Sequence, residues 1–588
     1  MKNSIWFKGR KRKAKNWIKS WADRWSRRAF LTLVMGLLAA YAAVCIGSSS
    51  RAACENALQA RTAQSSDSTN GRMPAHPAIF VDTNKAQSTG RIIPVSGTGE
   101  AAARAFQAAL DSARPGEVIA IEPGSIITGN FVLQNKRGEG WTVIRSSVAD
   151  DKLPSPGMRV KPTNASVMPK LVSPNADPVI RTAPGAHNYR FIAIEFTTAP
   201  GWAQNHGLIL LGDGGKAQDS PAAVPRDLIL DRCYIHGNAE VNLRRAVALN
   251  SASTAIIDSY ISDVHEVGAD SQAVCGWNGP GPFKIANNYL EAAGENIMFG
   301  GADPHIPNLV PADIEIRRNH FSKPLSWMHQ HPSYAGKHWS VKNLFELKNA
   351  RRVIIDRNLF ENNWVDGQSG FAILFTVRNQ EGTAPWSVIE DVAFTNNVVR
   401  HTAAGINFLG RDDNYPSEQA KRILVSNNLF DDVGGRQWGS NGRFLQIADS
   451  IDVVVDHNTA FQTGNVITAY GAPTKGFVFT NNIVLHNDYG VIGDGASIGN
   501  ATLEKYFPGS VFRKNVIAGG RNSIYPKDNY FPASMDEARF TDRRSGDYVL
   551  GDSSPYRGAG TDRKDIGCDL EVLKAAFNLS RPDSSVTN

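Results

Sequence analysis

The chain has 588 residues, of which 42% are hydrophobic and 20% charged, a composition that can bury a sizeable core. Its formal net charge of +7 comes from the first 28 residues, where eleven Lys/Arg and one acid contribute +10 and leave about −3 for the remaining 560 residues. The basic charge therefore belongs to a leader, and the charge of the rest of the chain does not indicate binding to nucleic acid.

Residues 1–52 have the features of an export signal. Ser26-Arg27-Arg28-Ala29-Phe30-Leu31 resembles the twin-arginine motif, and an apolar run follows from Ala29 to Ile46. Two interpretations stay open: cleavage at the small-residue site Ser50-Arg51-Ala52, or retention of the run as a membrane anchor, since eighteen residues just span a bilayer. Either way we expect export to the periplasm, the outer surface or the medium, with membrane contact only through this segment.

The rest of the chain reads as a linker and one β domain. Residues 53–90 are rich in Ser, Ala, Gln and Thr without apolar periodicity, which predicts a flexible linker. Residues 91–130 predict an N-terminal cap, because a helical pattern over 101–113 ends at Pro115-Gly116 and precedes an alternating strand. We expect coils over 131–520 and a C-terminal cap over 521–588.

One pattern repeats about every thirty residues between residues 189 and 520: a β-branched strand, an Asn, then a second apolar pair. Asn favours tight bends and can form a ladder between stacked turns. Three early copies hold other residues in this slot, namely Phe196, Cys233 and Tyr260, and Cys233 is expected to be a buried free thiol. The ladder positions are Asn288, Asn319, Asn358, Asn397, Asn428, Asn458, Asn482 and Asn515.

Eleven near-copies with strand-like alternation and almost no helical period predict an all-β repeat protein with about three strands per turn. From Ala101 to Asp569 the chain resembles right-handed parallel β-helix proteins of the pectate-lyase-like superfamily. The resemblance implies about eleven or more turns and an N-terminal capping helix, and it is specific for the fold rather than for the function.

A second strand precedes each Asn strand, and its alternation predicts one outward polar column. This column holds Asn296, Met298, Glu346, Lys348, Thr376, Arg378, Asn407 and Gln446. The loops beside it are enlarged at 300–312, 324–339, 378–386 and 411–416, and insertions in repeat proteins gather on the binding face. The loop aromatics, including Tyr334, suit stacking on sugar rings. The column is therefore the predicted groove for a polysaccharide.

The residue types in this groove favour a polysaccharide lyase. Such an enzyme needs a group that neutralises the substrate carboxylate, a base for the adjacent proton and an acid for the leaving oxygen. The candidates for these roles are Arg378, Lys348, Glu346, Lys323 and His305. The candidates for binding sugar are Asn296, Asn407, Gln446, Arg411, Trp327, Trp339, Trp386 and Tyr415. Glu295 and Asp303 could hold a Ca²⁺, the one cofactor that this chemistry suggests.

The segment from Asn288 to Gly301 resembles the calcium-binding stretch of chondroitinase B and related alginate lyases, but only Glu295 matches, so that mechanism does not carry over. A glycoside hydrolase is a competing interpretation, with Asp412-Asp413 as the carboxylate pair and Glu346 or Asp303 as partners. Polygalacturonases resemble the chain only in that pair. A non-catalytic, glycan-binding or structural β-helix is the other alternative. The histidines His305, His320, His329, His331 and His338 match no metal motif.

Overall fold

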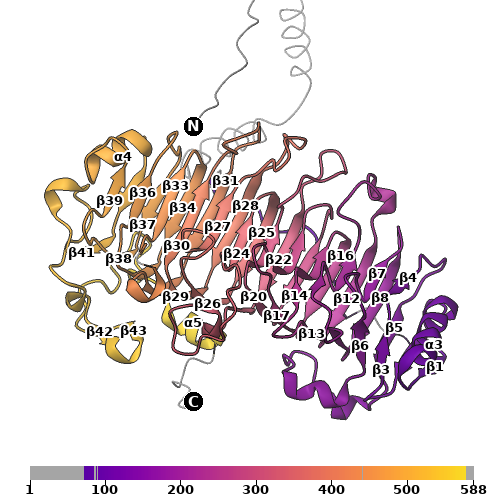
Figure 1. Cartoon of the computed structure of the whole chain (residues 1–588). Coiled ribbons are helices and arrows are strands. Elements are labelled where there is room, and N and C mark those ends of the chain that lie inside the picture. Colours follow the sequence, from indigo (N-terminus) through magenta and orange to yellow (C-terminus); the bar gives the residue numbers. More distant parts are fainter. Residues whose placement is uncertain (1–71, 85–87, 89, 440, 578–588) are drawn as a thin grey trace, which may run out of the picture. The chain divides into compact units, whose positions relative to one another are not determined.

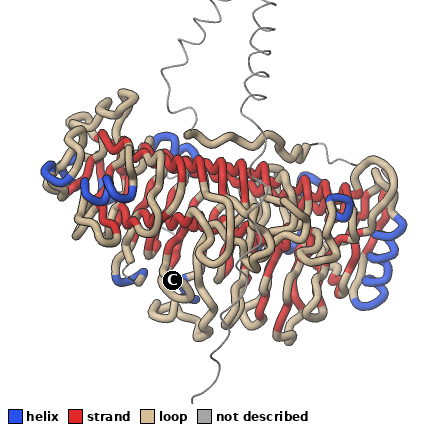
Figure 2. The backbone as a smooth tube through the Cα atoms, turned by 90° about the horizontal axis from the view of Figure 1, so that it is seen from above, coloured by secondary structure: helices blue, strands red, loops and turns tan. Residues whose placement is uncertain are grey.

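Three parallel β-sheets, here called A, B and C, run side by side along the domain (Figures 1 and 2). The computed structural model describes residues 72–84, 88, 90–439 and 441–577. The predicted export signal and most of the predicted linker lie outside these residues. Each turn passes through sheets C, A and B in that order, which makes a right-handed parallel β-helix, as the repeat predicts.

Sheet A contains the β-branched strand that precedes each ladder position, and its fourteen strands pair in parallel from one end of the domain to the other. They are β1 Ile92–Val95, β2 Val118–Ile121, β5 Thr142–Ser146, β8 His187–Ile192, β12 Arg226–Asp231, β16 Ala252–Ile257, β19 Phe283–Ala286, β22 Ala312–Arg317, β25 Ala350–Asp356, β28 Ile389–Thr395, β31 Lys421–Ser426, β34 Ile451–Asp456, β37 Val478–Thr480 and β40 Val511–Arg513.

Sheet B contains the strand that follows the ladder position, and it has thirteen strands. They are β3 Ile126–Thr128, β6 Lys170–Ser173, β9 Glu195–Thr198, β13 Tyr234–His236, β17 Tyr260–Val264, β20 Tyr289–Ala292, β23 His320–Ser322, β26 Leu359–Asn363, β29 Val398–Thr402, β32 Leu429–Val433, β35 Thr459–Gln462, β38 Ile483–Leu485 and β41 Val516–Ala518.

Sheet C has twelve strands and carries the predicted polar column. They are β4 Phe131–Leu133, β7 Ile180–Thr182, β11 Ile209–Leu211, β15 Arg245–Leu249, β18 Gln272–Gly276, β21 Glu295–Phe299, β24 Phe345–Leu347, β27 Phe371–Thr376, β30 Ala404–Leu409, β33 Leu445–Ala448, β36 Ile467–Ala469 and β39 Val491–Gly493. Its register aligns Met298, Glu346, Leu374, Asn407 and Gln446 in consecutive strands.

The Asn ladder is present. Asn358 Nδ2 donates to Asn397 Oδ1 at 3.0 Å, and the same geometry joins each neighbouring pair from Asn288 to Asn515. The left-handed residue of each bend is the one before the ladder Asn, for example Asn396 with φ 55°. Two early positions differ from the prediction: hydrogen bonding puts Ile194 and Ser259, not Phe196 and Tyr260, in the slot. Cys233 is a buried free thiol, as predicted.

Helices and two small strand pairs accompany the three long sheets. Helix α3, Gly99–Ser112, confirms the predicted capping helix and packs Phe106 edge-on against Phe131 with the ring centroids 4.8 Å apart. Helix α4, Asn500–Tyr506, contacts β39 at the other end, whereas helix α5, Leu570–Phe577, packs on the outside of sheet B against Val398 and Leu429. The remaining strands are the parallel pair β10, Gln204–Asn205, with β14, Asn242–Leu243, and the antiparallel pair β42, Phe540–Asp542, with β43, Asp547–Leu550.

Residues 72–84 form a strap that lies against sheet A, visible in Figure 2 as the loop segment crossing the strands between two grey stretches. The Ala78 amide donates to Asp313 of β22 at 2.8 Å and the Ala75 amide to Asp391 of β28 at 3.0 Å. Val81 is buried against Ile229 and Ala255. This part of the predicted flexible linker is therefore bound to the coil. Among the described residues, no helix is long and apolar enough to cross a membrane.

Candidate functional site

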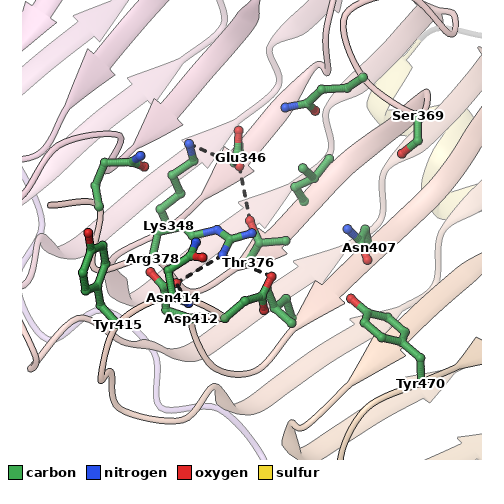
Figure 3. A pocket seen from close by; sticks show the side chains of 15 residues that line it. Glu346, Lys348, Ser369, Thr376, Arg378, Asn407, Asp412, Asn414, Tyr415 and Tyr470 are labelled. Atoms are coloured by element: carbon green, nitrogen blue, oxygen red, sulfur yellow. Dashed lines mark hydrogen bonds and ion pairs between the residues drawn. The ribbon is translucent and has the colours of Figure 1, made fainter. Parts of the chain in front are cut away.

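A groove of about 470 Å³ lies over sheet C, where the outward side chains of β24, β27 and β30 meet the loops that follow them (Figure 3). Glu346, Lys348, Thr376, Arg378 and Asn407, all from the predicted column, line it. Alternation along the strands places these side chains outward. Lys348 directly follows β24 and continues the same alternation, so its side chain also lies over the sheet. The candidate site is built on strands rather than on isolated loops.

Glu346 and Lys348 form a pair on the floor of the groove. Lys348 Nζ lies 3.7 Å from Glu346 Oε1. Thr376 Oγ1 donates to the same carboxylate oxygen at 3.2 Å, and Asn343 Nδ2 donates to the other at 3.3 Å. Only 3% of the Glu346 side chain is exposed, so these donors compensate its buried charge. The carboxylate is held rigidly, and it holds the ammonium group of Lys348 toward the groove.

Arg378 follows β27, and its guanidinium reaches across to the loop after β30. Its Nη1 lies 3.3 Å from Asp412 Oδ1 and 3.5 Å from Asp413 Oδ2. Asp412 is buried and also accepts from the backbone amides of Asn379 at 2.7 Å and Asn414 at 2.8 Å. The Asp412-Asp413 pair is thus the counter-ion of Arg378 and the cap of its own loop.

Neutral groups continue the column away from the two cations. Gln446 Nε2 donates to Asn407 Oδ1 at 3.2 Å, and Arg443 Nη1 donates to Gln446 Oε1 at 2.5 Å. Tyr470, which follows β36, also lines the groove, and Figure 3 shows its hydroxyl directed toward Asn407. Burial, reinforced by the nearby charge of Asp413, raises the pKa of Tyr470, so its hydroxyl stays protonated at neutral pH. Sequence reasoning missed Tyr470, although its position at the end of the predicted strand 466–470 could have suggested it.

Glu295 lies beyond Glu346 and is completely buried. Gln272 Nε2 donates to its Oε2 at 2.8 Å, and Lys342 Nζ lies 3.6 Å from its Oε1. Burial, with the charges of Glu346 and Asp270, raises the pKa of Glu295. Its predicted calcium partner has other contacts: Asp303 Oδ2 accepts from the amide and hydroxyl of Thr383, both at 2.8 Å.

The donor set around these two carboxylates does not amount to a calcium site. Calcium takes six to eight oxygen ligands. Within the described ranges, no group of three or more His, Cys, Asp or Glu side chains converges as metal ligands do. Asp303 instead ties the 300–312 loop to the 378–386 loop, and Glu295 is paired with Lys342. We therefore derive no step through calcium.

Two residues predicted to face the substrate are interior. Lys323 is fully buried, and its Nζ donates to the carbonyl oxygens of Ala292, Ala293 and Gly294 at 2.7 to 2.9 Å. Burial lowers the pKa of Lys323 to about 7. Asn296 is also fully buried and donates to the Ser322 carbonyl at 2.9 Å. Both therefore stabilise the bend before β21, and their prediction as groove residues is wrong.

The loop aromatics divide into packing residues and one groove residue. Trp327 and Trp339 are buried in a cluster around His265, whose ring stacks on Trp339 with the centroids 3.6 Å apart, so the prediction that they stack on sugars is wrong. Trp386 is partly exposed and donates through Nε1 to the Leu309 carbonyl at 3.0 Å. Tyr415 is 46% exposed and lines the groove.

His305 and Arg411 are exposed on their loops but do not line the groove. Arg411 binds Gln419 Oε1 at 3.0 Å. The other histidines of the sequence cluster have separate partners: His320 contacts Glu361 at 2.6 Å and His338 contacts Asp366 at 2.6 Å. These histidines therefore do not come together as a metal site.

The three parallel sheets define the class of the protein, a right-handed parallel β-helix with a polar groove on one sheet. No protein-family model matches the chain, and no curated protein matches it. Among solved structures it is similar to the PL6 family alginate lyase AlyGC. The identity is 12%, the match covers 84% of this chain and 59% of that chain, and the TM-score is 0.49. It is also similar to a PL6 alginate lyase in complex with a trisaccharide. The identity is 12%, the match covers 84% of this chain and 95% of that chain, and the TM-score is 0.46.

A tailspike mutant of E. coli bacteriophage HK620 in complex with a hexasaccharide is 14% identical, covering 73% of this chain and 62% of that chain at a TM-score of 0.44. The chain thus spans less than two thirds of the length of AlyGC and of the tailspike.

Proposed function

We propose that this protein is an exported enzyme that cleaves an acidic polysaccharide by β-elimination in the groove over sheet C. The observation that carries the proposal is the convergence of Lys348 and Arg378, from adjacent turns, over a groove lined by amides, hydroxyls and tyrosines. The guanidinium of Arg378 suits a uronate carboxylate, the amine of Lys348 beside it suits proton abstraction, and the amides and tyrosines suit the sugar ring and its hydroxyls. The similarity of the fold to structures described as alginate lyases is consistent with this chemistry.

The proposal gives each group a role. Arg378 pairs with the substrate carboxylate and so acidifies the adjacent C–H, and the Lys348 amine is the group placed to take that proton. The electron pair forms the C=C bond as the glycosidic C–O bond breaks. The Tyr470 hydroxyl, kept protonated by its raised pKa, can supply the proton that the leaving oxygen needs. Glu346 keeps Lys348 oriented.

The test is the appearance of ultraviolet absorbance from an unsaturated uronate when the full chain meets a panel of acidic polysaccharides. Lys348→Ala and Arg378→Ala should each lower kcat about a hundredfold or more while thermal unfolding stays unchanged. Arg411→Ala is the matched control, because Arg411 is exposed beside the same loop but does not line the groove. Full activity in both groove variants would refute the assignment.

Three carboxylates in the groove, Glu346, Asp412 and Asp413, keep a glycoside hydrolase as a second candidate. Asp412 is less available for that role because Arg378 and two backbone amides occupy it. New reducing ends without new absorbance would favour hydrolysis. Binding of oligosaccharides without either product would favour a non-catalytic glycan-binding protein.

A further inference from the structure

The charges of the groove are distributed unevenly along the coil. Its lining holds two cations, Lys348 and Arg378, and three carboxylates, a net charge of one negative. Both cations belong to neighbouring turns at one end, whereas the column beyond them is uncharged. From this distribution we infer that the groove takes an acidic heteropolysaccharide in which one uronate is followed by uncharged sugars, an inference that rests on the proposed function.

The end with the cations is closed. Met298 on β21 occupies the column position before Glu346 and is only 4% exposed. The loop after β21 folds over it: a Cβ on Gly301, where φ is 91°, would lie 2.6 Å from Met298 Cε. The chain needs glycine here because the backbone is both left-handed and in contact with the methionine. The groove therefore starts at β24, and sugars can extend from the cations in one direction only along the column.

That direction leads away from positive charge. One turn beyond Arg378, the loop after β30 presents Asp412 and Asp413, and Asp413 is 59% exposed at its side chain. A second carboxylate on the adjacent sugar would face Asp413 with no cation left over, because Arg378 is shared with both aspartates. Like charges at such a contact weaken binding, so a homopolymer of uronates is disfavoured.

The column side chains in that direction are uncharged. Asn407 on β30, Gln446 on β33 and Thr468 on β36 succeed one another in register. Five consecutive strands from β24 to β36 span about 19 Å at the usual strand spacing, enough for a short run of sugars. The next cation, Arg443, donates to Gln446 Oε1 from beside the column, and Gln446, Thr468 and Arg443 all lie beyond the residues that line the groove. Amides offer both donors and acceptors, which suits hydroxyl and N-acetyl groups.

The first experiment compares binding and turnover of length-matched oligosaccharides from two classes. Hyaluronan and unsulfated chondroitin fragments alternate a uronate with an N-acetylated sugar, and alginate and polygalacturonate fragments carry a carboxylate on every ring. We expect the full chain to bind the alternating class about tenfold more tightly or better. Equal or tighter binding of the homopolymers would overturn the inference even if they are cleaved. Preferential binding with no unsaturated product from any substrate would refute the proposed elimination alone.

The second experiment adds positive charge where the groove is neutral. Asn407→Lys and Gln446→Lys should each improve binding of the alginate fragments about tenfold, and the gain should fall with added salt. Asn522→Lys is the matched control, since Asn522 is exposed beyond β41 and adds the same charge away from the groove. If both groove variants leave the preference between the two classes unchanged, the subsite assignment is wrong.

Discussion

Replacing one ladder asparagine should weaken the coil by a predictable amount. Asn397 is fully buried, and its side chain makes four hydrogen bonds. Its Nδ2 donates to Ile355 O at 3.0 Å and Asn428 Oδ1 at 3.1 Å, and its Oδ1 accepts from the Asn358 amide at 2.8 Å and Asn358 Nδ2 at 3.0 Å. Because each hydrogen bond contributes about 1 kcal/mol to stability, Asn397→Ala should lower the free energy of unfolding of these turns by about 4 kcal/mol.

Native-state hydrogen exchange is the suitable assay, because a long repeat need not unfold in one step. Amides of β25 and β28 should exchange about a thousandfold faster in Asn397→Ala, since each 1.4 kcal/mol is a factor of ten. Asn522→Ala, an exposed asparagine without a ladder contact, is the control and should leave these rates unchanged. Exchange in Asn397→Ala within threefold of the parent would refute the reasoning that the ladder holds the turns together.

Three further outcomes follow from the described contacts. Burial alone would raise the pKa of Glu361, but contacts with His320 and Arg400 lower this pKa from 4.5 to about 2. The ionised carboxylate therefore stabilises the fold fully above pH 4.5, and this stabilisation is lost as the pH falls toward 2. Glu361→Gln should remove about 3 kcal/mol at neutral pH and abolish the loss of stability between pH 4.5 and 2, as hydrogen exchange of β23 and β26 would show. Trp339→Ala should cost about 3 kcal/mol in the same measurement, because Trp339 is a core residue. Tyr415→Ala should leave unfolding unchanged and weaken oligosaccharide binding roughly fivefold, about 1 kcal/mol, as titration calorimetry would show.

The sequence predicted the coil well because its signals are local and repeated. Alternation and the recurring Asn reveal the strands and the ladder without any knowledge of distant contacts. The errors at Phe196 and Tyr260 arise where the ladder lacks Asn, since an apolar alternation alone can be shifted along the strand. The left-handed residue of the bend could not be identified, because Asn396 and Asn397 are the same residue type and only the backbone distinguishes them.

The candidate site was predictable where it lies on strands and not where it lies on loops. Glu346, Lys348 and Asn407 face the groove because a two-residue period and the register place them there. Lys323 is interior because its ammonium group meets the carbonyls that follow β20, and Trp339 because it packs in a cluster of loop tryptophans, and no periodicity encodes either contact. Long side chains in insertions therefore need the tertiary structure before they can be assigned to a surface.

The strap of residues 72–84 also constrains the order in which the protein can be completed. The Ala75 amide meets Asp391 across 316 positions of the chain, and the Ala78 amide meets Asp313 across 235. These partners exist as a surface only after β22 and β28 have joined sheet A, so the segment synthesised early must dock late. In a refolding experiment with protease added in short pulses, we expect the strap to be cleaved until the coil has itself become resistant to the protease. Early protection of the strap would contradict this order. Arg72, at the start of the strap, also lies 3.7 Å from Asp452 of β34, so the bound strap marks a chain whose sheet A has been built as far as β34.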